Sequence, residues 1–253
     1  MRSKQPVAPN TSRAAQNFIA SFKEVESLRG FHEALTGTGR GYRPGMEVLN
    51  KSAIVLLCAI WEAYCEDLAD EALTHILAQS ADYTVLPDVL QRSIAKELKE
   101  DRHELSPWKL AGTGWKAYVH GRLPILKQKR EFDFNTPKAA RVEKFFEDAV
   151  GISKITDAWH WKHVSVEFAR RKLDQLVTLR GSIAHRGSAG QHVKKEDAAG
   201  YLEHVIRLVM ATDEEVGDEL HRITSIRSWG GGRQVESHDH HAAGGHHRAP
   251  GAA

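Results

Sequence analysis

One stretch constrains the fold more than any other, the unbroken apolar run from Ala53 to Trp61. Apolar and acidic residues keep helical spacing on both sides of it, which predicts one long helix over about 46–79. A helix that is apolar around its whole circumference must be covered by other elements, so this run marks the core helix of a domain. The run is much too short to cross a bilayer, so we expect no membrane segment.

The rest of the chain predicts more helices and no sheet, because no segment alternates apolar and polar residues for long enough. Ser106-Pro107 and Thr136-Pro137 are typical helix starts, and Gly151 is a typical helix end. Phe168 is expected on the inward side of its helix together with Leu173. The first predicted helix runs from about Ser12, with apolar positions up to Leu28, before a break that begins at Gly37. The other predicted helices cover about 46–79, 86–102, 106–122, 136–150, 164–186 and 194–226, with a short one near Trp159. The predicted fold class is all-α.

The two ends of the chain differ in composition from its middle. Residues 1–12 hold two prolines and few apolar anchors, and residues 229–253 are rich in Gly, His and Ala, so both are expected to be disordered. One helical domain over 13–228 remains. Clustered histidines can take up a metal opportunistically, but without cysteines or a fixed scaffold we expect no specific metal site. No cofactor-binding motif is found.

The net charge and the cysteines limit what the protein is expected to bind and in which compartment it is expected to lie. A formal net charge of +2 is close to neutral, so any contact with nucleic acid should be local. The only cysteines, Cys58 and Cys65, lie seven residues apart on one face of the core helix, as two buried apolar residues in a reducing compartment would. Residues 1–10 lack the apolar segment of a secretory signal, so a cytoplasmic protein is expected.

The residues that carry chemistry end the helix over 164–186, where Arg180 is followed five positions later by His185. An imidazole exchanges protons near neutral pH, and a guanidinium can grip a phosphate with two hydrogen bonds. Together they could drive attack of an RNA 2′-hydroxyl on the adjacent phosphorus. The structural alternative stays open: cations near a helix C-terminus offset its dipole, and Gly187 would be a plain cap. The same spacing at Arg233 and His238 falls in the low-complexity tail and is interpreted as chance.

Helix geometry limits how this pair can act. Five positions along an ideal helix rotate by about 140°, so Arg180 and His185 cannot converge within one straight helix. Either the helix frays at Gly181 or the two residues meet counterparts from a second chain.

Three blocks in order, AIVLLCAIWEAYCEDLADEAL, FDFNTPKAARVEKFFEDAVGISKITDAW and LVTLRGSIAHRG, carry a family resemblance. Over roughly residues 45–215 the sequence resembles the RiboL-PSP-HEPN family, a branch of the HEPN superfamily. The resemblance implies a HEPN-type helical bundle with added helices, which forms a homodimer with two Arg/His motifs at its interface. Many members are metal-independent endoribonucleases of bacterial defence or toxin–antitoxin systems, so RNA and an antitoxin or defence partner are the expected partners.

Residue by residue, Arg180 and His185 match the two signature positions of the family. Glu62 matches the acidic position on the core helix, where it would orient Arg180. Members with strong activity often have Asn, Asp or His directly after the Arg, and this chain has Gly181 there. Ser182 could serve as the polar group instead. Otherwise the chain would be a non-catalytic HEPN dimer that binds RNA or a protein.

Further basic residues are candidates for binding RNA. Arg170 and Arg171 lie two to three turns before Arg180 on the same predicted helix, and Arg186 follows the signature. A basic cluster in the least regular part of the interior would contact phosphates or simply be solvated; it consists of Lys127, Lys129 and Arg130. His160 and His163 flank Trp161 at what we interpret as an exposed amphipathic edge.

Overall fold

The computed structural model describes residues 11–36, 47–133, 137–186 and 193–229. Within these ranges the chain forms seven α-helices and three 3-10 turns, with no strand beyond one isolated bridge between Trp161 and Val164. The predicted all-α fold class is therefore confirmed. The helices are α1 (Arg13–Thr36), α2 (Glu47–Gln79), α3 (Asp88–Glu100), α4 (Gly114–Asp133), α5 (Ala139–Val150), α6 (Val166–Arg186) and α7 (Lys195–Thr224). The 3-10 turns are η1 (Tyr83–Val85), η2 (Ser106–Leu110) and η3 (Ile155–Ala158).

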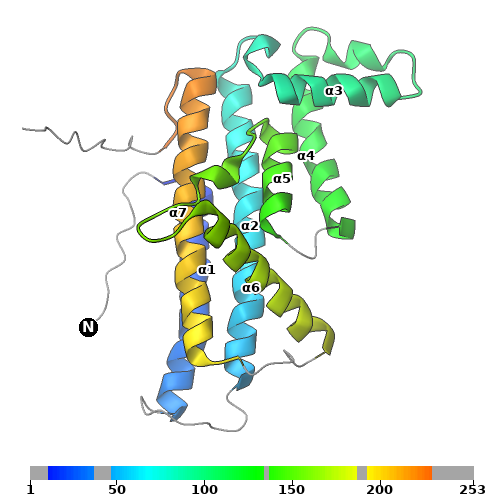
Figure 1. Cartoon of the computed structure of the whole chain (residues 1–253). Coiled ribbons are helices and arrows are strands. Elements are labelled where there is room, and N and C mark those ends of the chain that lie inside the picture. Colours follow the sequence, from blue (N-terminus) through cyan, green and yellow to red (C-terminus); the bar gives the residue numbers. More distant parts are fainter. Residues whose placement is uncertain (1–10, 37–46, 134–136, 187–192, 230–253) are drawn as a thin grey trace, which may run out of the picture.

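The predicted core helix, α2, lies at the centre of the bundle. It packs against α1, α4, α5, α6 and α7, and its apolar run is largely buried (Figure 1). By length and composition alone α2 could cross a membrane. In the 18-residue stretch of α2 that meets this test, 44% is buried inside the protein. A core helix that other helices cover passes the same test, and α2 contacts five other helices of the bundle.

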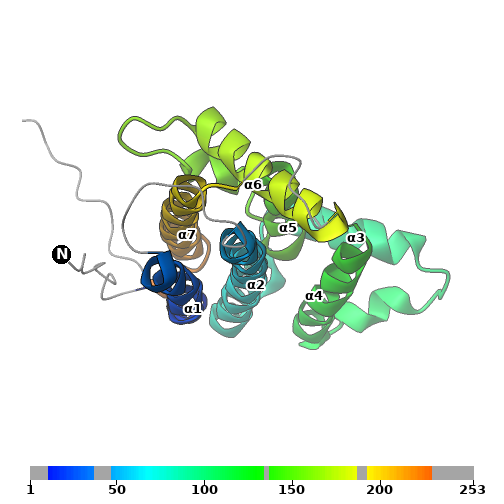
Figure 2. The same ribbon diagram turned by 90° about the horizontal axis from the view of Figure 1, so that it is seen from below.

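Helix α6 runs obliquely across the bundle and contacts α7, α2 and α5 (Figures 1 and 2). Its start lies against the middle of α7, and the two helices diverge toward the end of α6 (Figure 1). Ala169, Leu173, Leu176 and Val177 form its buried stripe. Phe168 was expected to point inward, but 41% of it is exposed, because it lies one step of about 100° away from Ala169 on the helix.

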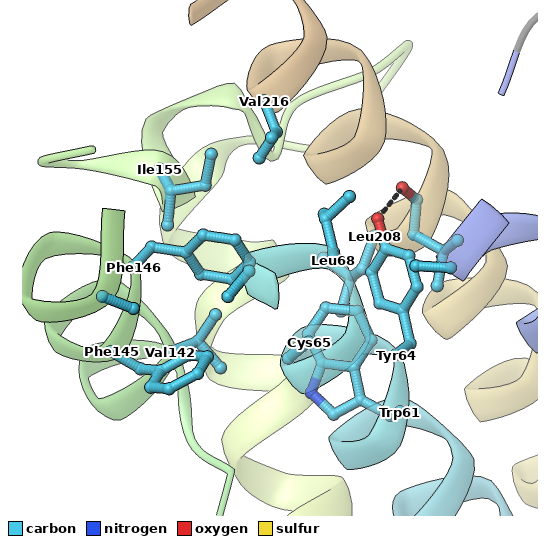
Figure 3. Close-up of a cluster of buried hydrophobic side chains, with 14 of the residues drawn as sticks. Trp61, Tyr64, Cys65, Leu68, Val142, Phe145, Phe146, Ile155, Leu208 and Val216 are labelled. Atoms are coloured by element: carbon cyan, nitrogen blue, oxygen red, sulfur yellow. Dashed lines mark hydrogen bonds between the residues drawn. The ribbon is translucent and has the colours of Figure 1, made fainter. Parts of the chain in front are cut away.

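Buried side chains of α2, α5, η3 and α7 form one cluster, with aromatic rings from α2 and α5 (Figure 3). The rings of Trp61 and Trp159 meet edge to face, with their centroids 6.0 Å apart. The Trp159 indole Nε1 donates to the Thr212 hydroxyl at 2.9 Å, and the Tyr64 hydroxyl donates to the Val209 carbonyl at 3.0 Å. Truncation of such a ring typically costs about 3–5 kcal/mol, so this cluster anchors the helices that carry the site.

Both ends of the described chain meet at Asp213 on α7. The Ser12 backbone N–H donates to Asp213 Oδ2 at 3.1 Å, and the Ser12 hydroxyl donates to the other carboxylate oxygen. The indole Nε1 of Trp229 donates to the Asp213 carbonyl at 3.0 Å. Ser12 also caps α1, accepting a hydrogen bond from the Ala15 N–H at 2.9 Å. The ends that we expect to be disordered lie outside the described residues, except for Thr11, Ser12 and Trp229.

The prediction of one helix over 106–122 is wrong. Ser106-Pro107 opens only the 3-10 turn η2, and Gly112, with a φ of +59°, separates it from α4. Helix α4 then continues through Pro124 to Asp133, so Lys127, Lys129 and Arg130 lie on a helix and not in a loop. The buried Arg122 helps to fix this part, because its guanidinium pairs with both carboxylate oxygens of Glu97 at 2.7 and 2.8 Å.

Candidate functional site at the end of helix α6

Arg180 continues the buried stripe of α6 toward the end of that helix. It is half-buried and follows Val177 by three residues and Leu176 by four, so it faces the same side as they do. That side of α6 packs on α2. The contact therefore holds the arginine between two packed helices.

Two α2 residues share this place, Cys58 and Glu62, which lie four positions apart on one face of the helix. Burial raises the pKa of the Cys58 thiol to about 12, opposed by the positive charge of Arg180 and aided by the negative charge of Glu62. Arg180 and Glu62 therefore both lie within electrostatic range of one thiol. The thiol itself is buried and stays protonated at neutral pH, so it is not a nucleophile.

Helix α6 does not fray at Gly181. The first of the two expected geometries, a break in the helix at that residue, is therefore wrong. The helix is continuous from Val166 to Arg186, so the backbone positions of Arg180 and His185 lie about 140° apart around the helix axis. The side chains of His185 and Arg186 lie outside the described residues. The Ser182 hydroxyl donates to the Thr178 carbonyl at 3.2 Å, one turn back in the same helix. That bond turns Ser182 toward its own backbone and not toward Arg180.

A groove of about 860 Å³ lies on another side of α6, between this helix and the start of α7. Arg180 does not line it, whereas Ser182 does. The groove is lined by Glu167, Arg170, Arg171, Asp174, Gln175, Thr178, Leu179, Ser182, Val193, Asp197 and Tyr201. The candidate site is therefore divided by α6, with Arg180 and Glu62 on the α2 side and Ser182 on the groove side.

Arg170 and Arg171, which the sequence suggests as equivalent RNA contacts, have different surroundings. Arg170 donates from Nε to the Thr156 hydroxyl at 2.8 Å, and from Nη2 to Asp157 at 2.6 Å and to Glu143 at 3.3 Å. It joins α6 to η3 and α5, and this structural role was not foreseen. Arg171 is exposed, with its guanidinium over the ring of Phe168, 5.5 Å from the centroid.

The remaining basic candidates are placed only by their backbones. Lys127, Lys129 and Arg130 lie in the last turns of α4, and their side chains are outside the described residues. His160 and His163 are exposed, while Trp161 is half-buried and its ring lies 5.5 Å from that of His204. No group of three or more His, Cys, Asp or Glu side chains suited to a metal ion occurs in the described ranges.

The sequence did not indicate two buried titratable residues of α7, His204 and Asp213. His204 Nε2 lies 3.0 Å from the Ala169 carbonyl, and burial lowers the pKa of the imidazole to about 4. Burial raises the pKa of the Asp213 carboxyl to about 6, while the Ser12 hydrogen bonds act against this rise. Asp213 follows the buried Val209 by four residues, so helical spacing could have located it.

Comparisons with known proteins add one match. The family model described as RiboL-PSP-HEPN matches residues 17–218, which include Glu62, Arg180 and His185. Searches of curated proteins and of solved structures give no match.

Proposed function

Because the chain belongs to the RiboL-PSP-HEPN family, we propose that it is a metal-independent endoribonuclease of the HEPN type. Family membership supports an RNA-related function, and cleavage of RNA is the further step of the proposal. The observation that carries it is the position of Arg180, whose charge acts with that of Glu62 on the Cys58 thiol of α2, five residues before His185.

In the proposed reaction a neutral His185 takes the proton from an RNA 2′-hydroxyl, whose oxygen attacks the adjacent phosphorus. The new 2′-O–P bond forms as the bond from phosphorus to the 5′-oxygen breaks, and an imidazolium returns a proton to that 5′-oxygen. Arg180 stabilises the negative charge that grows on the phosphoryl oxygens. The products are a 2′,3′-cyclic phosphate and a 5′-hydroxyl, so the reaction consumes no water. In this proposal the two side chains act without an added metal ion.

The proposal includes a homodimer. In an unbroken α6 the positions of Arg180 and His185 lie about 140° apart around the helix axis, so we expect one copy not to bring both side chains to one phosphate. Two copies that face one cleft would supply an arginine and a histidine to one linkage, and a second histidine to return the proton. A monomer at micromolar concentration with full activity would contradict this part of the proposal.

The setting is proposed from the family alone. We propose a cytoplasmic protein of bacterial defence or of a toxin–antitoxin system, in which an antitoxin or defence partner restrains the nuclease. Expression of the active chain should then arrest growth, and Arg180→Ala or His185→Ala should relieve the arrest. Growth arrest by all three proteins would contradict a toxic nuclease activity.

The direct test is RNA cleavage in EDTA by the wild type, Arg180→Ala and His185→Ala. We expect products with cyclic phosphate ends from the wild type and at least about 100-fold slower cleavage by both variants. His120→Ala is a matched control, because His120 is an exposed histidine of α4. Cleavage that His185→Ala retains in full would exclude the proposed role of His185.

One observation favours a second function, a non-catalytic HEPN module that binds RNA or a protein. Gly181 provides no polar side chain at the position after Arg180, and Ser182 is bonded within its own helix. RNA that the wild type binds but leaves uncut, with no difference from His185→Ala, would favour this second function.

A further inference from the structure

Phe168 is an exposed aromatic residue next to the groove of α6. It is 41% exposed, and the Arg171 guanidinium lies over its ring at 5.5 Å from the centroid. An arginine stacked on an aromatic ring forms two adjoining flat surfaces, and both kinds of surface stack on nucleobases. Arg171 lines the groove, and Phe168 lies beside the groove through its contact with Arg171.

The groove side of α6 continues from this pair toward the Arg/His signature. Exposed or half-buried positions recur every three or four residues, which places them along one helix face. Along this face lie Phe168, Arg171, Gln175, Thr178 and Ser182. Arg and Gln side chains hydrogen-bond to the edges of bases. The hydroxyls of Thr178 and Ser182 donate to carbonyls one turn back in α6, which leaves them as acceptors toward a base.

The charges of the groove do not favour a phosphate track. Its lining holds two arginines, and Arg170 is engaged by Glu143 and Asp157. The lining also includes three acidic residues, of which Asp174 accepts the Ala139 N–H at 2.9 Å. A strand whose phosphates lay in this groove would meet these carboxylates, so its bases are the better occupants.

We propose that Phe168 and Arg171 form a stacking site for one unpaired nucleobase of an RNA strand that lies along α6. The bases face the helix and the phosphates face solvent. This inference rests on the proposed function, since it names a subsite for the same RNA. From Phe168 to His185 is about 26 Å along the helix axis at about 1.5 Å per residue. At about 3.4 Å per stacked nucleotide the base lies within roughly eight nucleotides of the cleaved linkage.

The proposal predicts a local loss of affinity. Loss of one base–aromatic contact weakens binding about 5- to 150-fold, and the effect is tied to one nucleotide of the strand. Because few phosphates are neutralised in the groove, affinity should also fall only slightly as salt rises.

The test uses single-stranded RNA oligonucleotides in which one abasic nucleotide is moved stepwise away from the cleaved linkage. Affinities are measured for the wild type, Phe168→Ala, Phe168→Leu and Phe168→Trp. We expect one position at which the abasic nucleotide weakens binding to the wild type and to Phe168→Trp, but not to Phe168→Ala or Phe168→Leu. Trp108→Ala, which removes an aromatic residue 73% exposed on η2, should behave as the wild type does.

The two proposals fail in different ways. If the wild type cleaves RNA and Phe168→Ala keeps the full pattern of abasic effects, the stacking site is overturned and the nuclease stands. If the wild type neither binds nor cleaves RNA, the proposed function and the stacking site fall together. An equal loss of affinity for every oligonucleotide in Phe168→Ala would also overturn the site, since a stacking contact is specific to one position.

Discussion

The guanidinium of Arg180 on α6 lies within electrostatic range of the buried thiol of Cys58 on α2. Glu62, one turn further along α2, acts on the same thiol with the opposite sign. Arg180 is half-buried, so the helix contact restricts where its charge can go. A restricted charge costs little reorganisation during a reaction, which is what stabilisation of a transition state requires.

Arg180→Lys tests whether the reaction uses the planar guanidinium or only its charge. Lysine keeps the positive charge near Cys58 but cannot form two parallel hydrogen bonds to a phosphate. We expect cleavage about 100-fold slower at saturating RNA, with a free energy of unfolding close to that of the wild type. Arg207→Lys, on an exposed position of α7, is the matched control. A wild-type rate in Arg180→Lys would contradict two-point binding of the phosphate.

Gly181 offers a test by gain of function. A Cβ added there meets nothing within 4 Å, and the residue lies inside a regular helix. Gly181→Ala should therefore raise the free energy of unfolding by about 0.5–1 kcal/mol without changing the rate of cleavage. Gly181→Asn adds a polar group at the position where the family resemblance implies one in active members, so we expect faster cleavage than by Gly181→Ala. Equal rates for the two variants would show that this position has no catalytic part here.

The helices were predictable because apolar spacing reports burial directly. The run from Ala53 to Trp61 identified the core helix, and Gly151 ends α5 in the left-handed conformation with a φ of +77°. The same periodicity misplaced Phe168, since a bulky apolar residue beside the buried stripe resembles one within it. The sequence did not predict that Gly112 separates η2 from α4, because a glycine in such a stretch fits a continuous helix as well as a break between two elements.

The candidate site was predictable only in part. The family motif indicates Glu62 and Arg180, which both act on Cys58. No periodicity distinguishes Arg170 from Arg171, because the partners of Arg170 come from α5 and η3, far away in the sequence. Contacts between distant segments, such as Ser12 with Asp213, are likewise invisible to local patterns.

Asp213 should make the protein less stable as the pH rises. Its folded-state pKa is about 6 against an ordinary value of 3.8, because burial, with a smaller effect of Glu71, disfavours the charged form. Its stabilising contribution is therefore complete below about pH 3.8 and is lost as the pH rises through about 6, a change of about 3 kcal/mol. Urea unfolding of the wild type and Asp213→Asn at pH 4 and pH 7 measures it. A difference between the two proteins that does not change with pH would contradict this expectation.

His204 should have the opposite effect over nearly the same pH range. Burial, together with the charge of Lys172, lowers its folded-state pKa from 6.5 to about 4. Its contribution is complete above about pH 6.5 and is lost as the pH falls through about 4, again about 3 kcal/mol. His204→Gln keeps a donor for the Ala169 carbonyl but cannot titrate. In this variant unfolding should become less sensitive to acid, while Asp213→Asn should become more sensitive. Parallel changes in both variants would contradict one of the two assignments.

Arg170→Ala and Arg171→Ala should separate stability from RNA binding on neighbouring positions of α6. Arg170 donates to Thr156, Asp157 and Glu143, so its loss leaves the buried Thr156 and the half-buried Glu143 without this donor, while Asp157 is exposed to water. We expect the free energy of unfolding to fall by about 1–3 kcal/mol, with little change in RNA affinity once folding is restored at low temperature.

The Arg171 guanidinium lies over the Phe168 ring, and both residues are exposed, with Arg171 in the lining of the groove. Its truncation should leave the free energy of unfolding within about 0.5 kcal/mol of the wild type, while RNA affinity falls. Urea unfolding and oligonucleotide titration of the same two samples provide the comparison. The reverse pattern, with Arg170→Ala defective in binding and Arg171→Ala unstable, would mean that the ion-pair network of Arg170 opens to receive RNA.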